Sequence, residues 1–202
     1  MITKEQLVAI CPGCEARADA HLPFLTSAMQ RYGINTRLRV AMFVAQVLHE
    51  TGGLTHMREN MNYSAQGLIN TFSKYFKKTE ALVFARKPEM IGNRAYANRF
   101  GNGPESSGDG YKFRGGGYFH LTFRDNYAEF SKEVSMDLVS KPELIATPEF
   151  ASLSAGWFWK TRKLNVFADA GDLKRCTAVL NGGFNGLEQR RLYYERALIA
   201  IK

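Results

Sequence analysis

Residues 35–60, NTRLRVAMFVAQVLHETGGLTHMREN, contain the strongest helix signal in the chain. Apolar residues recur there at the i, i+3, i+4, i+7, i+8 spacing of one helix face, namely Val40, Phe43, Val44, Val47 and Leu48. The glycine pair at 52 and 53 then interrupts the pattern. The stretch therefore predicts a core helix that begins after Asn35-Thr36 and ends close to Glu50.

Glu50 continues the apolar face, because it lies three residues after Val47 and seven after Phe43. Burial and the negative end of the helix dipole both favour the protonated form of a carboxyl at this position. A protonated carboxyl is what a general acid requires. Glu59 follows in irregular, more exposed chain, where we expect it to be ionised and able to act as a base.

Two carboxyl groups in unlike environments suit glycoside hydrolysis, and nine residues across a helix end and a turn can leave the gap for water that an inverting enzyme needs. Solvated charges at a helix end are the simpler alternative. A zinc site is a third interpretation, since HETGGLTH resembles the HExxH motif. Gly53 occupies the position of the second histidine, however, and His49 and His56 are seven residues apart across the glycines. We therefore expect no metal and no other cofactor.

Helical periodicity dominates the chain and predicts a mainly α-helical protein, and the length suits a single domain of residues 1–202. No run of 18 apolar residues and no secretory h-region is found, so we expect synthesis in the cytoplasm without a signal peptide. The 27 Lys and Arg residues exceed the 19 Asp and Glu residues by 8. Such a basic surface favours a polyanion: nucleic acid, anionic membrane or acidic cell-wall polymer.

The three cysteines make a disulfide framework improbable, because their number is odd. Cys11 and Cys14 have the CxxC spacing of a redox pair or of half a zinc site. Cys176 has neither Cys nor His within a few residues and supplies no second pair of zinc ligands. The default interpretation is that the two nearby cysteines are reduced and incidental.

Other segments carry clear start signals or unusual composition. Helices are predicted to begin after Thr3, Ser64 and Thr147 and near Asn185. Residues 100–117, FGNGPESSGDGYKFRGGG, hold seven of the 18 glycines, and so long a loop is disordered or functional. The loop leads into YFHLTF, residues 118–123, where aromatic and β-branched residues predict a short extended segment. We expect the glycine-rich loop to form one wall of a cleft.

Three motifs in the correct order resemble those of the family 19 glycoside hydrolases, the chitinase-like group of the lysozyme superfamily. They are HETGG at 49–53, YANRFGNGPESSGDGYKFRGGGYFHLTFRDNY at 96–127 and NGGFNGLEQR at 181–190. The match is closest to the phage endolysin branch. The resemblance implies a mainly α-helical, lysozyme-like fold of two lobes with a central substrate cleft and at most short β segments.

The resemblance also assigns roles to individual residues. Glu50 corresponds to the general acid, Glu59 to the base that activates water, and Thr122 to the residue that helps hold this water. Three further positions match family residues that line the sugar cleft or brace the acidic residues: Asn126, Asn181 and Arg190. Tyr63, Tyr111 and Tyr127 are candidates for stacking on sugar rings, with core packing as the alternative.

The chain departs from the family pattern at two positions. Gly116 stands where the family has an arginine, which removes a fixed cation and its forked donors. His120 stands where the family has glutamine, and it offers one donor and one acceptor as a candidate sugar ligand. Both departures concern substrate contacts and leave the acid, the base and the threonine in place.

The sequence as a whole favours an endolysin that cleaves the MurNAc–GlcNAc bond of peptidoglycan glycan strands. We expect a monomer, synthesised in the host cytoplasm, that reaches the periplasmic wall through a holin-type release. The basic surface is compatible with peripheral contact with anionic membrane or wall. We do not expect nucleic acid as a partner, because the sequence contains no basic recognition helix. The alternatives are an exported toxin, a chitinase and a catalytically decayed wall-binding module.

Overall fold

The computed structural model describes residues 2–202, and this part of the chain is α-helical. Within it, the only β structure is two isolated bridges, Arg58–Gly116 and Gly116–Leu121. The prediction of a mainly α-helical fold is confirmed. The chain divides into two compact units, each described by itself below. Unit 1 runs up to Met57 and includes 117–119 and 145–202, whereas unit 2 comprises 58–116 and 120–144.

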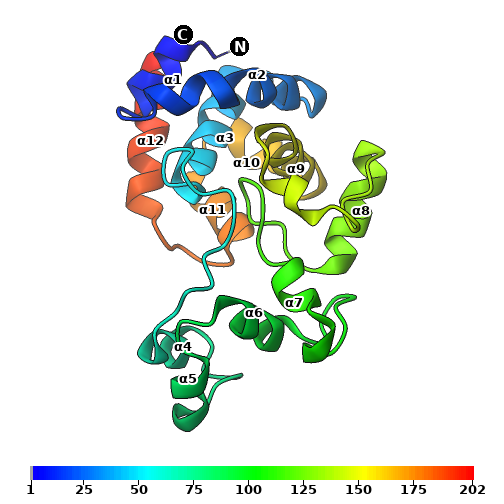
Figure 1. The fold of residues 1–202 in the computed structure, drawn as a ribbon. Coiled ribbons are helices and arrows are strands. Elements are labelled where there is room, and N and C mark those ends of the chain that lie inside the picture. The colour runs from blue at the N-terminus through cyan, green and yellow to red at the C-terminus, as the bar shows by residue number, and fades with distance from the viewer. Residues whose placement is uncertain (1) are drawn as a thin grey trace. The chain divides into compact units, whose positions relative to one another are not determined.

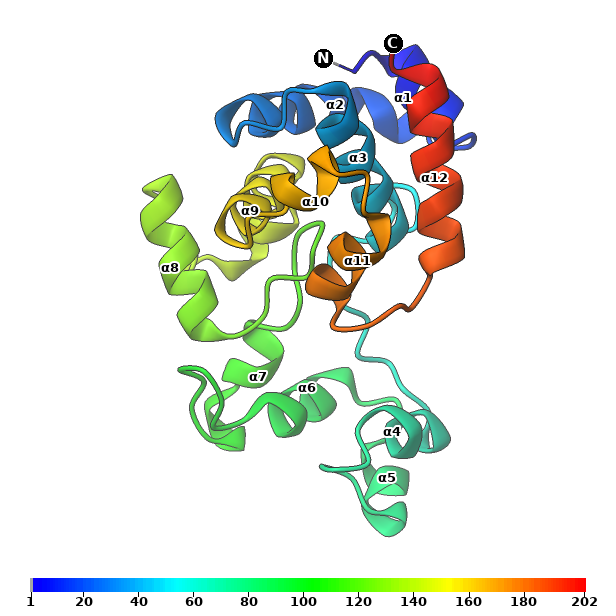
Figure 2. The same cartoon turned by 180° about the vertical axis from the view of Figure 1, so that it is seen from behind.

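Unit 1 contains the longer helices and is built around α3. Its helices are α1 (Lys4–Ile10), α2 (Glu15–Arg31), α3 (Arg37–Glu50), α9 (Pro148–Thr161), α10 (Asn165–Asp169), α11 (Leu173–Asn181) and α12 (Leu187–Ala200). In Figures 1 and 2, α12 runs alongside α3 and reaches α1, so the first and last helices are neighbours. Helix α9 packs against α2.

Helix α3 is the centre of the unit 1 core. Every residue from Val40 to Leu48 is buried, including Gln46. The sequence predicts a helix with one apolar face, but α3 is buried all round from Val40 to Leu48, with α12 and α10 among the helices packed against it. Phe43 packs edge-on against Trp159 of α9, with 5.2 Å between the ring centroids. A helix enclosed in this way holds its last residue, Glu50, in a fixed place.

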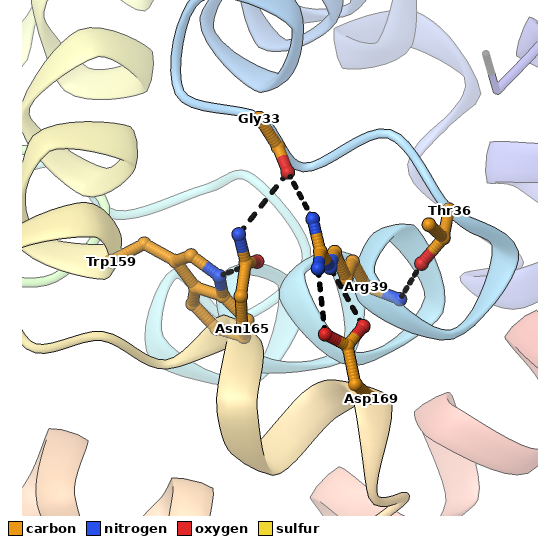
Figure 3. Close-up of polar contacts among 6 residues, drawn as sticks. All are labelled: Gly33, Thr36, Arg39, Trp159, Asn165 and Asp169. Atoms are coloured by element: carbon orange, nitrogen blue, oxygen red, sulfur yellow. Dashed lines mark hydrogen bonds and ion pairs between the residues drawn. The ribbon is translucent and has the colours of Figure 1, made fainter.

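The turn from α2 into α3 is held by polar contacts that Figure 3 shows in detail. Arg39 donates to both carboxylate oxygens of Asp169, at 2.7 and 2.6 Å, and to the carbonyl oxygen of Gly33 at 3.1 Å. Asn165 also donates to Gly33 and accepts a hydrogen bond from the Trp159 indole. These bonds join α10 to the start of α3 and hold that end of the helix.

Unit 2 has shorter helices and a smaller core. Its helices are α4 (Ala65–Thr71), α5 (Lys78–Phe84), α6 (Pro88–Tyr96), η1 (Glu105–Ser107), α7 (Asp109–Lys112) and α8 (Arg124–Val134), and η2 (Pro142–Ala146) lies where the chain returns to unit 1. Edge-to-face aromatic pairs fill the core, among them Phe72 with Tyr96 and Phe76 with Phe84. Arg94 stacks on Phe84 at 4.0 Å and pairs with Glu80 and Glu105.

The start signals found in the sequence are confirmed. Thr3, Thr36 and Ser64 cap α1, α3 and α4 through their side-chain oxygens, and α9 begins with Pro148 after Thr147. The last helix starts at Leu187, two residues after the predicted position. No helix within residues 2–202 is long and apolar enough to cross a membrane. The assignment of the whole chain to a single catalytic domain stays a prediction.

Two predictions about residues 100–123 were wrong in detail. The glycine-rich segment is not only loop, because η1 and α7 lie within it. One reason for its glycines is close packing: a β-carbon on Gly110 would lie 2.3 Å from the carbonyl oxygen of Gly92. Residues 118–120 form a turn and Leu121 makes only an isolated bridge, so no extended segment forms; His120 and Phe123 adopt positive φ angles of 49° and 77°.

Candidate active site

Glu50 is the last residue of α3, and its side chain is 16% exposed, as the helical spacing predicts. One carboxylate oxygen, Oε1, accepts a short hydrogen bond from Nη2 of Arg190. The other oxygen, Oε2, has no hydrogen bond to residues 2–202. Glu50 is therefore held by one oxygen and leaves the second available to carry a proton.

Arg190 is the buried partner that fixes Glu50. Its side chain is 1% exposed on α12, where Nη1 donates to Oε1 of Gln46 and Nε donates to the carbonyl oxygen of Asn185 at 3.3 Å. Gln46 in turn donates to Oγ1 of Thr177 at 3.1 Å. A buried cation requires such partners, since an unpaired charge in the core is very costly. The network joins α3, α11 and α12.

The buried guanidinium changes the electrostatic picture drawn from the sequence. The spacing of the sequence places Glu50 at a buried helix end but does not indicate the Arg190 cation that pairs with its carboxylate. Contact with a glutamate is consistent with the predicted bracing role of Arg190, while the roles of both residues in catalysis stay predictions.

The turn after α3 positions His49 as well as Glu50. The backbone N–H of Gly53 donates to the carbonyl oxygen of Leu48 at 2.8 Å, which closes the helix. The His49 ring packs against Gly186, where a β-carbon would lie 2.0 Å from Cε1. The pKa of His49 is lowered mainly by burial and to a smaller extent by the Arg190 cation, so the imidazole is neutral near pH 7.

Residues 2–202 contain no group of three His, Cys, Asp or Glu side chains arranged to hold a metal.

Glu59 belongs to unit 2 and is held by neutral donors. Its Oε1 accepts a hydrogen bond from the Tyr96 hydroxyl at 2.7 Å, and its Oε2 accepts one from the backbone N–H of Gly115 at 3.1 Å. Its own N–H donates to the carbonyl oxygen of Gly115 at 2.8 Å. Both carboxylate oxygens of Glu59 therefore have donors, and the side chain is half-buried and less exposed than the sequence suggests.

Tyr96 is the residue that our reasoning from sequence missed. Burial, and then the charge of Glu59, raise the pKa of Tyr96 above its usual range, so the phenol keeps its proton and remains a donor. The tyrosine is the last residue of α6 and the first letter of the YANR motif at 96–99. That motif position was a usable signal, but nothing in the sequence showed that the hydroxyl meets Glu59.

Thr122 and His120 flank Leu121, whose backbone is hydrogen-bonded to Gly116, the residue after the Gly115 that contacts Glu59. Leu121 and Gly116 exchange backbone hydrogen bonds of 2.7 and 3.0 Å. A β-carbon on Gly115 would lie 3.0 Å from Cβ of His120 and 3.4 Å from Oε2 of Glu59, so Gly115 separates these two side chains. His120 Nε2 is buried and has no hydrogen-bond partner among residues 2–202. A sugar amide or hydroxyl would satisfy it.

Thr122 is half-buried, and its hydroxyl donates to the carbonyl oxygen of His120 at 2.8 Å. The oxygen keeps its capacity to accept a hydrogen bond from water. Asn126, in the first turn of α8, donates from Nδ2 to the carbonyl oxygen of Thr122 at 2.6 Å. The amide therefore braces the threonine, and its predicted contact with sugar stays a prediction.

The remaining candidate sugar ligands fall into two groups. Tyr127 is fully buried and donates to the carbonyl oxygen of Arg114, so it packs in the core and cannot stack on a sugar. Tyr63 and Tyr111 are only partly buried and stay candidates, with Tyr63 edge-on to Phe72. The pKa of Tyr63 is raised mainly by burial and to a smaller extent by the charge of Glu59.

The predicted site residues are divided between the two units. Unit 1 holds Glu50, Asn181 and Arg190, and unit 2 holds Glu59, Thr122, His120, Asn126, Tyr63 and Tyr111. Asn181 ends α11, and its buried Nδ2 has no hydrogen-bond partner among the described residues. Each unit thus contributes one glutamate with its own supporting hydrogen bonds.

All three cysteines belong to unit 1. Cys11, Cys14 and Cys176 are free and buried. The pKa of Cys14 is raised to about 11, mainly by burial and to a smaller extent by Cys11. Burial raises the pKa of Cys176 to about 12. Thiols that stay protonated at neutral pH are poor nucleophiles and poor metal ligands.

Comparison with known proteins shows the family to which the chain belongs. The family model described as chitinase class I, glycoside hydrolase family 19, matches residues 19–170. A glycosyl hydrolase family 19 domain-containing protein of Haemophilus influenzae is 40% identical over 177 residues, which cover 87% of this chain and 86% of that protein. A basic endochitinase of Vitis vinifera is 38% identical over 76 residues, 37% of this chain and 22% of that protein. The chain belongs to glycoside hydrolase family 19.

Solved structures show the same fold. Chitinase C from Streptomyces griseus HUT6037 superposes with a TM-score of 0.65 at 17% identity, over 99% of this chain and 92% of that one. A bacterial family 19 chitinase gives a TM-score of 0.64 at 18% identity, over 99% and 94% of the two chains. The all-α fold of residues 2–202 is thus that of the family 19 chitinases.

Proposed function

We propose that this family 19 glycoside hydrolase is an endolysin that cleaves the β-1,4 bond between MurNAc and GlcNAc in peptidoglycan, with inversion. The observation that carries the proposal is the unlike support of the two glutamates. Glu50 is held by Arg190 through one oxygen only, whereas both oxygens of Glu59 accept hydrogen bonds from neutral donors. The first arrangement leaves an oxygen for a transferable proton, and the second stabilises a carboxylate.

In the proposed reaction, Glu50 gives a proton from Oε2 to the leaving oxygen of the glycosidic bond. Glu59 removes a proton from the attacking water, which the oxygen of Thr122 helps to position. Inversion requires both carboxyl groups to act on the same bond from opposite faces of the sugar, with water between. The carboxylate of Glu59 has lone pairs beyond the two already used by Tyr96 and Gly115, so it can still accept this proton.

The basic surface supports an anionic polymer as substrate. The chain carries a net charge of +8, and peptidoglycan bears the carboxylates of its peptide stems, whereas chitin is neutral. We further propose that the protein acts as a monomer on the periplasmic wall after a holin-type release. A chitinase remains the second candidate, favoured by the named activities of the Vitis vinifera relative and the solved structures.

Contact with an anionic membrane or wall surface is a separate part of the proposal. Five exposed cations surround α5 of unit 2, and they are Lys74, Lys77, Lys78, Arg86 and Lys87. Leu82 and Val83 are exposed between them, by 74% and 56%. Cations around an apolar tip suit an anionic lipid surface. Co-sedimentation with phosphatidylglycerol vesicles, lost in the Leu82→Ser/Val83→Ser protein and at high salt, would support this contact, and equal binding to neutral vesicles would contradict it.

Hydrolysis is tested with the parent protein and four variants. Glu50→Gln and Glu59→Gln remove the proposed acid and base, and Glu195→Gln and Glu89→Gln are controls on exposed glutamates of units 1 and 2. Each protein is added to outer-membrane-permeabilised Gram-negative cells and, separately, to colloidal chitin. We expect wall clearing and new reducing ends from the parent and both controls, with no new free amines, and no clearing from the other two variants.

Each contrary outcome has a defined meaning. New free amines would identify an amidase or peptidase and rule out the glycosidase proposal. Cleavage of chitin without wall clearing would favour the chitinase, and wall binding without hydrolysis would favour a decayed binding module. Full activity of Glu50→Gln would remove its assignment as the acid. The first anomer released, observed by NMR, tests inversion independently.

A further inference from the structure

An exposed aromatic ring lies in the loop that joins α11 to α12 of unit 1, drawn orange to red in Figure 2. Phe184 is 54% exposed, although a large apolar side chain is usually buried. The ammonium of Lys174 lies 5.2 Å from the centroid of this ring. Lys174 is exposed and forms no ion pair with any residue from 2 to 202, while neighbouring Arg175 pairs with Asp172.

The loop is tied to the end of α3 that carries Glu50. The carbonyl oxygen of Asn185 accepts a hydrogen bond from Arg190, whose other end binds Glu50. Gly186 lies directly against His49, the residue before Glu50. The Phe184 carbonyl oxygen accepts a hydrogen bond from the first N–H of α12 at 3.2 Å. The loop that carries the exposed ring is therefore tied to the end of α3 that carries the proposed acid.

Helix α11 carries an unsatisfied polar group on the face that also holds Lys174. Lys174, Ala178 and Asn181 follow one another at i, i+4 and i+7, so they share one face of the helix. Asn181 Nδ2 is a buried donor without a partner among the described residues. An apolar ring, an ammonium and an amide donor on adjacent elements match a sugar that also carries a negative charge.

We propose that Lys174 and Phe184 form a subsite for the muramoyl sugar of peptidoglycan. The ring of Phe184 packs against the apolar C–H face of the pyranose, and the Lys174 ammonium binds a carboxylate attached to that sugar. This carboxylate belongs to the peptide stem or, in glycan without peptides, to the lactyl group. The inference rests on the proposed function and names the feature by which the site distinguishes peptidoglycan from neutral chitin.

The test compares KM and kcat on three substrates: intact peptidoglycan, glycan strands stripped of peptides by an amidase, and neutral GlcNAc oligomers. Lys174→Gln removes the charge, and Lys160→Gln is a matched control on an exposed lysine of α9. A charge-assisted contact predicts that Lys174→Gln raises KM for intact peptidoglycan about tenfold, with kcat unchanged. KM for the neutral oligomers stays the same, and Lys160→Gln changes neither value.

The stripped glycan identifies the source of the carboxylate. A raised KM for Lys174→Gln on stripped glycan assigns the contact to the lactyl carboxylate, and an effect confined to intact peptidoglycan assigns it to the stem. Phe184→Ala should raise KM on all three substrates, and Phe184→Trp should restore it because stacking needs a ring and not a particular side chain.

Two outcomes would overturn the inference at different levels. If the parent releases reducing ends from peptidoglycan but Lys174→Gln has the same KM on charged and neutral substrates, only the subsite is wrong. If the parent hydrolyses neutral oligomers alone, the proposed function and the subsite are both wrong. Thermal unfolding of each variant separates these results from loss of fold.

Discussion

Glu50 and Glu59 are nine positions apart in the sequence, yet they are held by different chemistry. Glu50 is nearly buried in unit 1 and is balanced by the charge of Arg190. Glu59 is half-buried in unit 2 and is balanced by the dipoles of a phenol and a backbone N–H. A full counter-charge is needed where the surroundings are apolar, whereas hydrogen bonds are sufficient where water still reaches the carboxylate.

The supports of the two glutamates follow from the cores beneath them. In unit 1, α3 is buried from Val40 to Leu48 and packs against α12, and this core buries a guanidinium together with Gln46. In unit 2, the core is a small cluster of aromatic rings around short helices, with Tyr96 among them. Changes at the supports of Glu50 should therefore alter stability and activity together, and changes at the support of Glu59 should alter mainly activity.

The largest effect is expected from Arg190→Met. The substitution leaves Glu50 and Gln46 without their buried partner, and breaking such a pair costs about 3–5 kcal/mol of unfolding free energy. Urea denaturation measures this loss, and wall clearing should disappear as well. Arg191→Met is the matched control, because Arg191 is exposed and reaches only Glu188, and its cost should stay within about 0.5 kcal/mol. Equal losses in the two variants would contradict the comparison.

The next effect is expected from Gly186→Ala, paired with Gly182→Ala. Both glycines have φ +70°, so alanine costs about 1–2 kcal/mol of backbone strain at either position. A methyl group at 182 meets nothing within 4 Å, but at 186 it meets the His49 ring. Displacing that ring adds about 1–3 kcal/mol. Thermal unfolding should therefore rank Gly186→Ala as the less stable variant, and identical melting temperatures would show that His49 moves freely.

Tyr96→Phe should reduce activity more than stability. The variant loses the donor to Oε1 of Glu59, and a hydrogen bond to a charged group contributes about 1.5–3 kcal/mol, so kcat should fall at least about tenfold. Tyr75→Phe is the control, since Tyr75 lies in the same aromatic cluster and has no contact with either glutamate. Release of reducing ends gives kcat, and an unchanged kcat for Tyr96→Phe would show that this phenol does not support the base.

The smallest effect concerns a second buried polar contact of unit 1, in which Nδ1 of His21 lies 2.7 Å from the Tyr118 hydroxyl. Burial, and then Arg17, lower the pKa of His21, so the unfolded chain binds a proton more readily than the folded protein. The contribution of His21 to the free energy of unfolding therefore has its full value above the ordinary histidine pKa of 6.5, and it falls as the pH drops below that value.

His21→Gln removes this titration and should make stability less dependent on pH. Urea midpoints of parent and variant, measured at pH 7.5 and 5.5, give the two slopes. His49 also has a lowered pKa, but it is present in both proteins and cancels from the comparison. A variant whose midpoint falls as steeply as that of the parent would show that His21 is not the group responsible.

The sequence predicted most of what depends on neighbouring residues. The spacing of apolar residues placed α3 and the inward direction of Glu50, and capping residues such as Thr3 and Ser64 located helix starts. The motifs at 49–53, 96–127 and 181–190 indicated the family that the comparisons show. These signals are readable because hydrogen bonds and side-chain spacing within a helix act over only a few residues.

Only the tertiary structure decided how each glutamate is supported. Glu50 meets Arg190 across 140 residues of sequence, and Glu59 meets Tyr96 across 37. Neither pairing has a periodicity or a cap to reveal it, because it depends on how α12 packs on α3 and how α6 packs within the aromatic cluster. The sequence alone thus determined which residues stand at the ends of the helices, and long-range packing determined which charges and donors they meet there.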